Sequence, residues 1–108
     1  MKYVLMFFET ESYASEMRAK GATEQDVAYE AVGRWLAENA DKITHWTHLK
    51  HPYTATTVRL EAIIDGTVGD GPETFSGYAE IEVADIDEAL RLARTWPACP
   101  IVEIRPAA

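Results

Sequence analysis

Cysteine is nearly absent from this chain of 108 residues, which contains only Cys99. A single cysteine cannot form an intramolecular disulfide, so we expect a reducing, cytoplasmic environment. Zinc sites built from paired cysteines are excluded as well. A nucleophilic cysteine needs a neighbouring base, but the residues next to Cys99 are Ala98 and Pro100. We therefore interpret Cys99 as a small packed thiol.

Basic residues are few, with 10 Lys and Arg against 18 Asp and Glu and a net charge of −8. No stretch gathers Lys or Arg into a patch, so phosphate backbones and anionic membrane surfaces would repel the chain. We expect neither a nucleic acid nor a membrane as a partner. The apolar run over residues 3–8 is shorter than the ~20 residues of a membrane span and lacks a signal-peptide cleavage site. It predicts a strand of the mature protein, buried on both faces.

Several catalytic motifs are missing too. The sequence has no glycine-rich phosphate loop and no Gly-x-Ser-x-Gly elbow, which excludes the usual nucleotide hydrolases and α/β-hydrolases. No cofactor is expected. The length and the 47% hydrophobic content suit one domain over residues 1–108. Because so small a core leaves much surface exposed, pairing with a second copy is the expected state.

Two helices are predicted. Residues 9–21 are polar without a clear period, so we predict a loop there, with the alternative of a short helical turn around Tyr13 to Ala19. Thr23 can cap a helix, and apolar residues recur after it at three- and four-residue spacing, which predicts a helix over residues 23–39. A second helix is predicted to begin at Asp85, an acidic capping residue, and to end before Pro97.

Alternating apolar and polar residues, together with the first apolar run, predict strands at residues 3–8, 44–49, 57–64, 77–83 and 101–105. The Asp65-Gly66 pair predicts a hairpin turn, with a short returning strand after it. The order is strand, helix, strand, inserted hairpin, strand, helix, strand. This predicts an α+β fold of the ferredoxin-like βαββαβ kind, with both helices on one face of an antiparallel sheet.

Blocks along the whole chain resemble the YCII-related family, and in particular its branch named for an Asp-Gly-Pro-Phe motif. The blocks are Met1-Lys2-Tyr3-Val4-Leu5, Ala55-Thr56-Thr57-Val58-Arg59, Asp70-Gly71-Pro72, Gly77-Tyr78, Asp87-Glu88-Ala89-Leu90 and Val102-Glu103-Ile104-Arg105-Pro106. The sequence departs from that branch at Glu73, where the motif has Phe.

The resemblance implies a homodimer of the dimeric α/β barrel type, in which two sheets face each other. Some YCII-type proteins are proposed to use a His and Asp pair, with the His on the first helix. No His lies between Thr23 and Asn39, so that pair is not transferred to this chain.

Three histidines, His45, His48 and His51, fall in or just after one predicted strand. Neighbours in this set are an odd number of residues apart and so point to opposite faces of a strand. His45 and His51 share a face but would lie roughly 20 Å apart, too far for one metal ion. We therefore predict no metal site. His48 is the best functional candidate of the three, while the simpler interpretation makes all of them partly exposed polar residues.

Four further residues join His48 as candidates. Asp70 either shapes a turn before Gly and Pro or acts with His48 as an acid or base. Arg59 either pairs with a surface acid or anchors a small carboxylate. Glu73 and Tyr78 complete the rim of a possible site.

Two hypotheses follow for the function. The first is a binding protein or acid/base enzyme for a small organic acid, with a cleft between the sheet and the hairpin. There His48 and Asp70 would be catalytic, and Arg59, Glu73 and Tyr78 would bind the substrate. The second is a noncatalytic dimeric module that binds a protein partner or senses a metabolite.

Overall fold

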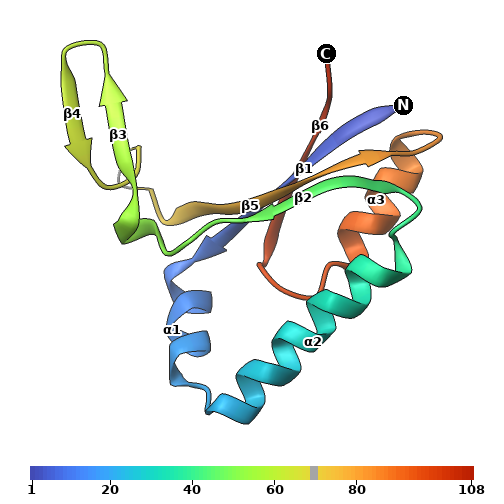
Figure 1. The fold of residues 1–108 in the computed structure, drawn as a ribbon, viewed down its shortest axis with the longest axis horizontal. Helices are drawn as coiled ribbons and strands as arrows, with labels where there is room; N and C mark the ends of the chain where they lie inside the picture. The colour runs from blue at the N-terminus through green and yellow to red at the C-terminus, as the bar shows by residue number, and fades with distance from the viewer. Residues whose placement is uncertain (69–70) are drawn as a thin grey trace.

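The computed structural model describes residues 1–68 and 71–108, and Figure 1 shows its elements. The strands are β1 (Lys2–Thr10), β2 (Ile43–His48), β3 (Thr56–Arg59), β4 (Ala62–Asp65), β5 (Glu73–Glu82) and β6 (Ile101–Pro106). The helices are α1 (Glu11–Ala19), α2 (Ala22–Glu38), the short 3-10 turn η1 (Pro52–Thr54) and α3 (Ile86–Thr95).

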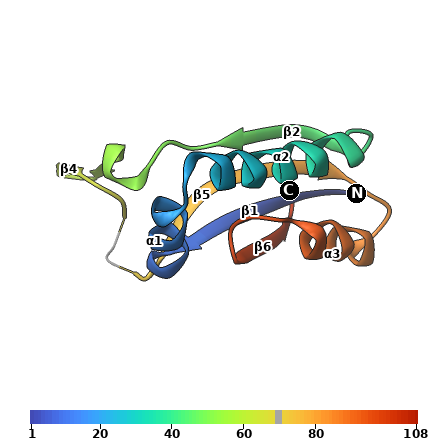
Figure 2. The same ribbon diagram turned by 90° about the horizontal axis from the view of Figure 1, so that it is seen from below.

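The main sheet has the strand order β2-β5-β1-β6, and every neighbouring pair in it is antiparallel. Strands β3 and β4 form a separate two-stranded sheet. Helices α2 and α3 lie on one side of the main sheet, while the β3–β4 hairpin projects from its end (Figures 1 and 2). The predicted α+β class is confirmed, with helices gathered on one face of an antiparallel sheet.

The core lies between the main sheet and helices α2 and α3. Alternate residues of β1 and β5 point toward the helices and are buried, as the two-residue period of a strand requires. The buried hydrophobic residues are Tyr3, Leu5, Phe7, Trp35, Ala79, Ile81, Val83, Ala89 and Leu92. The indole Nε1–H of Trp35 donates to the Leu92 carbonyl oxygen at 3.2 Å and to Thr95 Oγ1 at 3.1 Å, which joins α2 to α3.

Helix α3 begins as predicted, because the Asp85 carboxylate accepts from the Glu88 N–H at 3.0 Å. The loop predicted over residues 9–21 is wrong in its main part, since α1 occupies Glu11–Ala19. Thr10 caps this helix by accepting from the Tyr13 N–H at 3.1 Å. Helix α1 contains no buried residue, so the sequence carries no apolar stripe to reveal it.

The hairpin differs from its prediction in the position of its turn. Residues 57–64 do not form one strand, because the chain turns at Leu60 and Glu61 and pairs Arg59 with Ala62. Gly66 has a φ of 103°, a conformation that favours glycine. It lies at the base of the hairpin, however, and not in the turn where the Asp65-Gly66 pair had been expected. At the base, the Gly66 N–H donates to the Ala55 carbonyl oxygen at 2.7 Å.

A β-bulge interrupts the pairing of β1 with β5. Phe7 faces Gly77 and Phe8 faces Phe75, so Ser76 has no opposite residue. A bulge redirects the side chain of the extra residue. Ser76 is buried and its Oγ donates to the Phe7 carbonyl oxygen at 3.2 Å.

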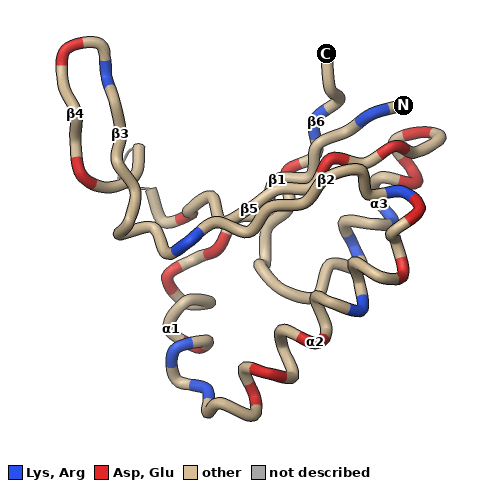
Figure 3. The backbone as a smooth tube through the Cα atoms, in the orientation of Figure 1, with Lys and Arg blue, Asp and Glu red and all other residues tan. Residues whose placement is uncertain are grey.

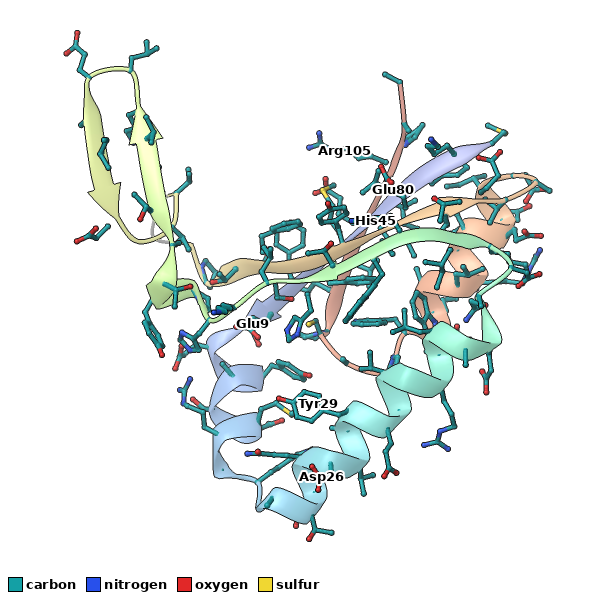
Figure 4. All side chains as sticks on the ribbon, viewed as in Figure 1. Glu9, Asp26, Tyr29, His45, Glu80 and Arg105 are labelled. Atoms are coloured by element: carbon teal, nitrogen blue, oxygen red, sulfur yellow. The ribbon has the colours of Figure 1, made fainter. Side chains whose placement is uncertain are left out.

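The face of the sheet opposite the helices is uncovered in the single chain. The prediction that residues 3–8 are buried on both faces is correct for one face only, because Val4, Met6 and Phe8 remain partly exposed. Figure 4 shows His45, Glu80 and Arg105 on this uncovered side of the sheet. Ring contacts connect Phe8 to Phe75, Phe75 to Tyr78 and Tyr78 to His45 along the same face.

Charged residues are distributed over helices, strands and hairpin in the part of the chain drawn in Figure 3, and the blue Lys and Arg segments form no continuous patch. In the same part of the chain, each helix is too short or too polar to cross a lipid bilayer.

Candidate functional site

A cavity of about 620 Å³ opens between the sheet and helices α1 and α2. Its wall combines aromatic and aliphatic side chains with a small number of polar groups. The polar and titratable lining residues are Glu9, Tyr13, Arg18, Tyr29, Thr47, His48, Lys50, His51, Ser76 and Cys99. This volume lies within the ~300–1,000 Å³ of typical small-molecule sites, which have the same mainly apolar composition.

The cavity exists because α1 turns the chain away from the sheet directly after β1. Thr10 ends the strand and caps the helix, so Glu9 lies at the opening between them. The chain then returns along α2, and Gln25 fixes the junction by donating to the Met17 and Lys20 carbonyl oxygens at 3.1 Å each. Figure 4 shows Tyr29 directed from α2 into the space toward α1, with Glu9 on the same side of the sheet.

Cys99 lies in the wall of this cavity and is half-buried. Its Sγ lies 3.1 Å from Ser76 Oγ. Burial raises the pKa of the Cys99 thiol, and the Glu9 carboxylate adds to the increase, while the Ser76 hydroxyl opposes it. The thiol therefore stays protonated at neutral pH, which agrees with the interpretation of Cys99 as a packed thiol.

Tyr13 extends from α1 into the same cavity. Burial, together with the Cys99 and Glu9 charges, raises the pKa of Tyr13 from 10.0 to about 12. Its hydroxyl is consequently a hydrogen-bond donor throughout the neutral range. Sequence reasoning missed Tyr13 and Glu9, because neither belongs to a motif and α1 was not predicted.

His48 lies at the edge of the cavity, on the helix side of β2, and it is exposed. It pairs with Gly77 on β5. A Cβ on Gly77 would lie 2.6 Å from the Thr47 carbonyl oxygen and 3.3 Å from the His48 Cα, so only glycine permits this approach of the two strands. The bulge and Gly77 together thus position the strand segment that carries His48.

A second hollow of about 500 Å³ lies at the base of the hairpin, where sequence reasoning had placed the cleft. Glu73 and Phe75 from β5 line it, together with Thr57 from β3. Lys50 and His51 line both hollows, so the segment between β2 and η1 separates them.

The other predicted site residues do not gather with His48. Among the described residues, Arg59 and Tyr78 line neither hollow. Arg59 is exposed beside the turn of the hairpin, and Tyr78 lies on the uncovered face against His45, with ring centroids 5.6 Å apart. Asp70 lies outside the described residues. Glu73 is therefore separated from His48 by the Lys50–His51 segment.

The prediction that neighbouring histidines point apart is confirmed for His45 and His48, which lie on opposite faces of β2. His45 Nε2 lies 2.9 Å from Thr47 Oγ1. His51 instead caps η1, because its Nδ1 accepts from the Tyr53 N–H at 3.3 Å. Within residues 1–68 and 71–108, no three side chains of metal-binding type converge.

Neither a protein-family model nor a curated protein sequence matches this chain. The chemistry that the cavity can support follows from its own residues. They supply a carboxylate at Glu9, hydroxyl donors at Tyr13 and Tyr29, a neutral thiol at Cys99 and an imidazole at His48. These groups can orient a bound molecule and exchange protons with it.

Proposed function

We propose that this protein binds a small, mainly apolar organic molecule in the cavity between the sheet and helices α1 and α2. The observation that carries the proposal is a hollow of about 620 Å³ with an aromatic and aliphatic wall, in which a few polar groups converge. An apolar body gains about 25 cal/mol for each Å² that it removes from water, so such a wall supplies affinity. Glu9, Tyr13 and His48 supply orientation and, where the bound molecule is a substrate, acid/base chemistry.

An acid/base role in a cleft is the part of the sequence hypothesis that this proposal retains, with His48 in the site. The organic-acid part depended on Arg59 as the anchor of the carboxylate. Arg59 lies on the hairpin and lines neither hollow. The proposal therefore leaves Arg59 and Tyr78 out of the site.

Filling the cavity tests this function. Val32 lines the cavity from α2, whereas Val27 on the same helix is 57% exposed and does not line it. In a thermal-shift screen of apolar organic molecules, ligands should raise the melting temperature of the wild type. Val32→Trp should abolish these shifts, and Val27→Trp should keep them. Equal shifts in wild type and Val32→Trp would place binding elsewhere, and a screen without any shift would contradict the function.

We further propose that the chain is a ferredoxin-like homodimer related to the YCII-related group, with the uncovered faces of two sheets packed together. The strand order β2-β5-β1-β6 supports this topology, since it is the order of two interleaved βαβ units. The row of rings from Phe8 to His45 supports the use of this face. Glu80 and Arg105 lie on the same face, so a pairing of two copies can place opposite charges against each other (Figure 4).

The β3–β4 hairpin adds a second argument for a partner chain. Val58 and Ile63 face each other across its strands and are 74% and 75% exposed. An exposed apolar pair on a projecting hairpin holds the two strands together only weakly and costs solubility. A second copy that covers the sheet face can also cover this hairpin.

Sedimentation of matched variants tests the dimer. Phe75 on the uncovered face is 38% exposed, and Leu90 on α3 is 37% exposed. Phe75→Glu should convert the protein to a monomer, because it places a charge in the interface. Leu90→Glu should leave the dimer intact. A wild type that sediments as a monomer at high micromolar concentration would exclude the dimer.

A further inference from the structure

Glu9 is the only carboxylate among the described residues that line the cavity between the sheet and helices α1 and α2. It lies on the helix side of β1, one step beyond Phe7 in the strand period, and it is half-buried. Within residues 1–68 and 71–108, its side chain makes neither a hydrogen bond nor an ion pair. Glu9 therefore places one negative charge in a wall that is mainly apolar, where a bound cation can pair with it.

The charge of Glu9 reaches across the cavity. It raises the pKa of Tyr13 on α1 and of Cys99 on the segment before β6. Tyr13 and Cys99, on two different walls, are thus both affected by the negative charge of Glu9. A second anion in this part of the cavity would be repelled, and a cation would be attracted.

The cationic side chains of the wall do not supply that partner. Arg18 is engaged on α1, where its Nη2 donates to Glu11 at 3.0 Å and to Ser15 at 3.2 Å. Lys50 is exposed on the segment between the two hollows. The positive charge that complements Glu9 must therefore come with the ligand.

The remaining wall suits the body of a cationic ligand. Tyr13, Tyr29, Trp46 and Trp96 all line the cavity, and aromatic rings attract ammonium groups that approach their faces. Figure 4 shows Tyr29 directed into this space on the same side of the sheet as Glu9. The net charge of −8 adds a long-range attraction for cations.

We propose that the ligand of this cavity is an organic amine with an aromatic or alicyclic body, whose ammonium group pairs with Glu9. This inference rests on the proposed function, because it names the ligand class of the same cavity. The ammonium would donate to the Glu9 carboxylate in a charge-assisted hydrogen bond, while the apolar body contacts Trp46 and Trp96. The Tyr13 hydroxyl is available as a further polar contact beside Glu9.

Three probes with one carbon skeleton test the ligand class: naphthylmethylamine, naphthylmethanol and naphthoate, substituted at the same ring carbon. Isothermal titration should show that the amine binds about tenfold more tightly than the alcohol, and the naphthoate weakest. Glu9→Gln should remove most of the preference for the amine and change the affinity for the alcohol by less than about twofold. Glu16→Gln, which removes one charge from α1 outside the cavity, should keep the preference.

The outcomes separate the two proposals. Equal binding of the three probes, or tightest binding of naphthoate, would overturn the amine class and leave the cavity as a binding site. Binding of none of them would contradict both proposals. Glu9→Ala also removes the charge and should remove the preference for the amine, while Glu9→Asp keeps the charge and should keep it, so this pair decides the matter if Glu9→Gln does not fold.

Discussion

Ser76 Oγ lies 3.1 Å from Cys99 Sγ and 3.2 Å from the Phe7 carbonyl oxygen, so one hydroxyl links β5, β1 and the segment before β6. The bulge in β5 makes this link possible, because it turns Ser76 toward the helix side of the sheet. The hydroxyl can turn from the carbonyl to the sulfur when the thiol ionises. A change in the geometry of the bulge should therefore change the reactivity of the Cys99 thiol.

Ser76→Ala should raise the pKa of Cys99 further, because the Ser76 hydroxyl lowers this pKa against the effect of burial. The measurement is the rate of iodoacetamide alkylation as a function of pH. Ser12→Ala, on the exposed side of α1, is the control and should behave as the wild type. Faster alkylation of Ser76→Ala at neutral pH would contradict the assigned role of the hydroxyl.

Tyr13 should make stability depend on pH in the alkaline range. Its pKa is about 12 in the folded chain and 10.0 in the unfolded one, so between these values the folded state binds more protons. The free energy of unfolding should fall as the pH rises from 10.0 to about 12. Tyr13→Phe should reduce this fall in urea titrations, and Tyr53→Phe, on exposed η1, should not. An identical pH dependence for wild type and Tyr13→Phe would refute the assignment.

Trp35 and Trp46 should respond differently to the same substitution. Trp35→Phe removes an indole N–H that donates to Leu92 and Thr95, and we expect a loss of about 2–3 kcal/mol. The Trp46 indole N–H is buried and has no acceptor among the described residues. Trp46→Phe removes an unsatisfied donor along with apolar volume, so the loss should be about 1 kcal/mol or less. Equal losses in urea unfolding would show that the hydrogen bonds of Trp35 contribute nothing.

Gly77 should tolerate no side chain. Gly77→Ala places a Cβ 2.6 Å from the Thr47 carbonyl oxygen, so we expect a loss of about 1–3 kcal/mol and a displacement of β2. Gly33→Ala on α2 meets no atom within 4 Å and should stabilise the chain by up to about 1 kcal/mol. Thermal unfolding of both variants measures the difference. A neutral Gly77→Ala would show that β2 moves freely against β5.

The core elements were predictable because their signals are local and periodic. The alternation of residues 77–83 places Ala79, Ile81 and Val83 inward, as the structure shows. The capping role of Asp85 is equally local. Helix α1 was missed because it buries none of its residues, so no apolar period marks it.

The candidate site was less predictable, since it depends on contacts between distant segments. His48 was a candidate because it is a histidine on a predicted strand. Glu9 and Tyr13, which line the same cavity, come from the junction of β1 and α1, and no sequence motif marks that junction. Arg59 was misplaced relative to the site because the hairpin turns at Leu60 instead of Gly66, and the Arg59 side chain then lies near the tip. A glycine in the sequence, such as Gly66, indicates that the backbone can adopt a positive φ there. It does not indicate whether that bend forms the tip or the base of a hairpin.

The unpaired residue Ser76 also resets the phase of β5. Beyond it, even-numbered residues such as Tyr78 and Glu80 face away from the helices, while before it the odd-numbered Phe75 does, opposite Phe8. A frame shift of one residue normally exchanges the two sides of a strand completely. Here the extra residue is built in, so a deletion of Ser76 would leave Phe75 opposite Phe8 and Gly77 opposite Phe7 in a regular ladder, and would remove only the bulge and the contacts of the Ser76 hydroxyl.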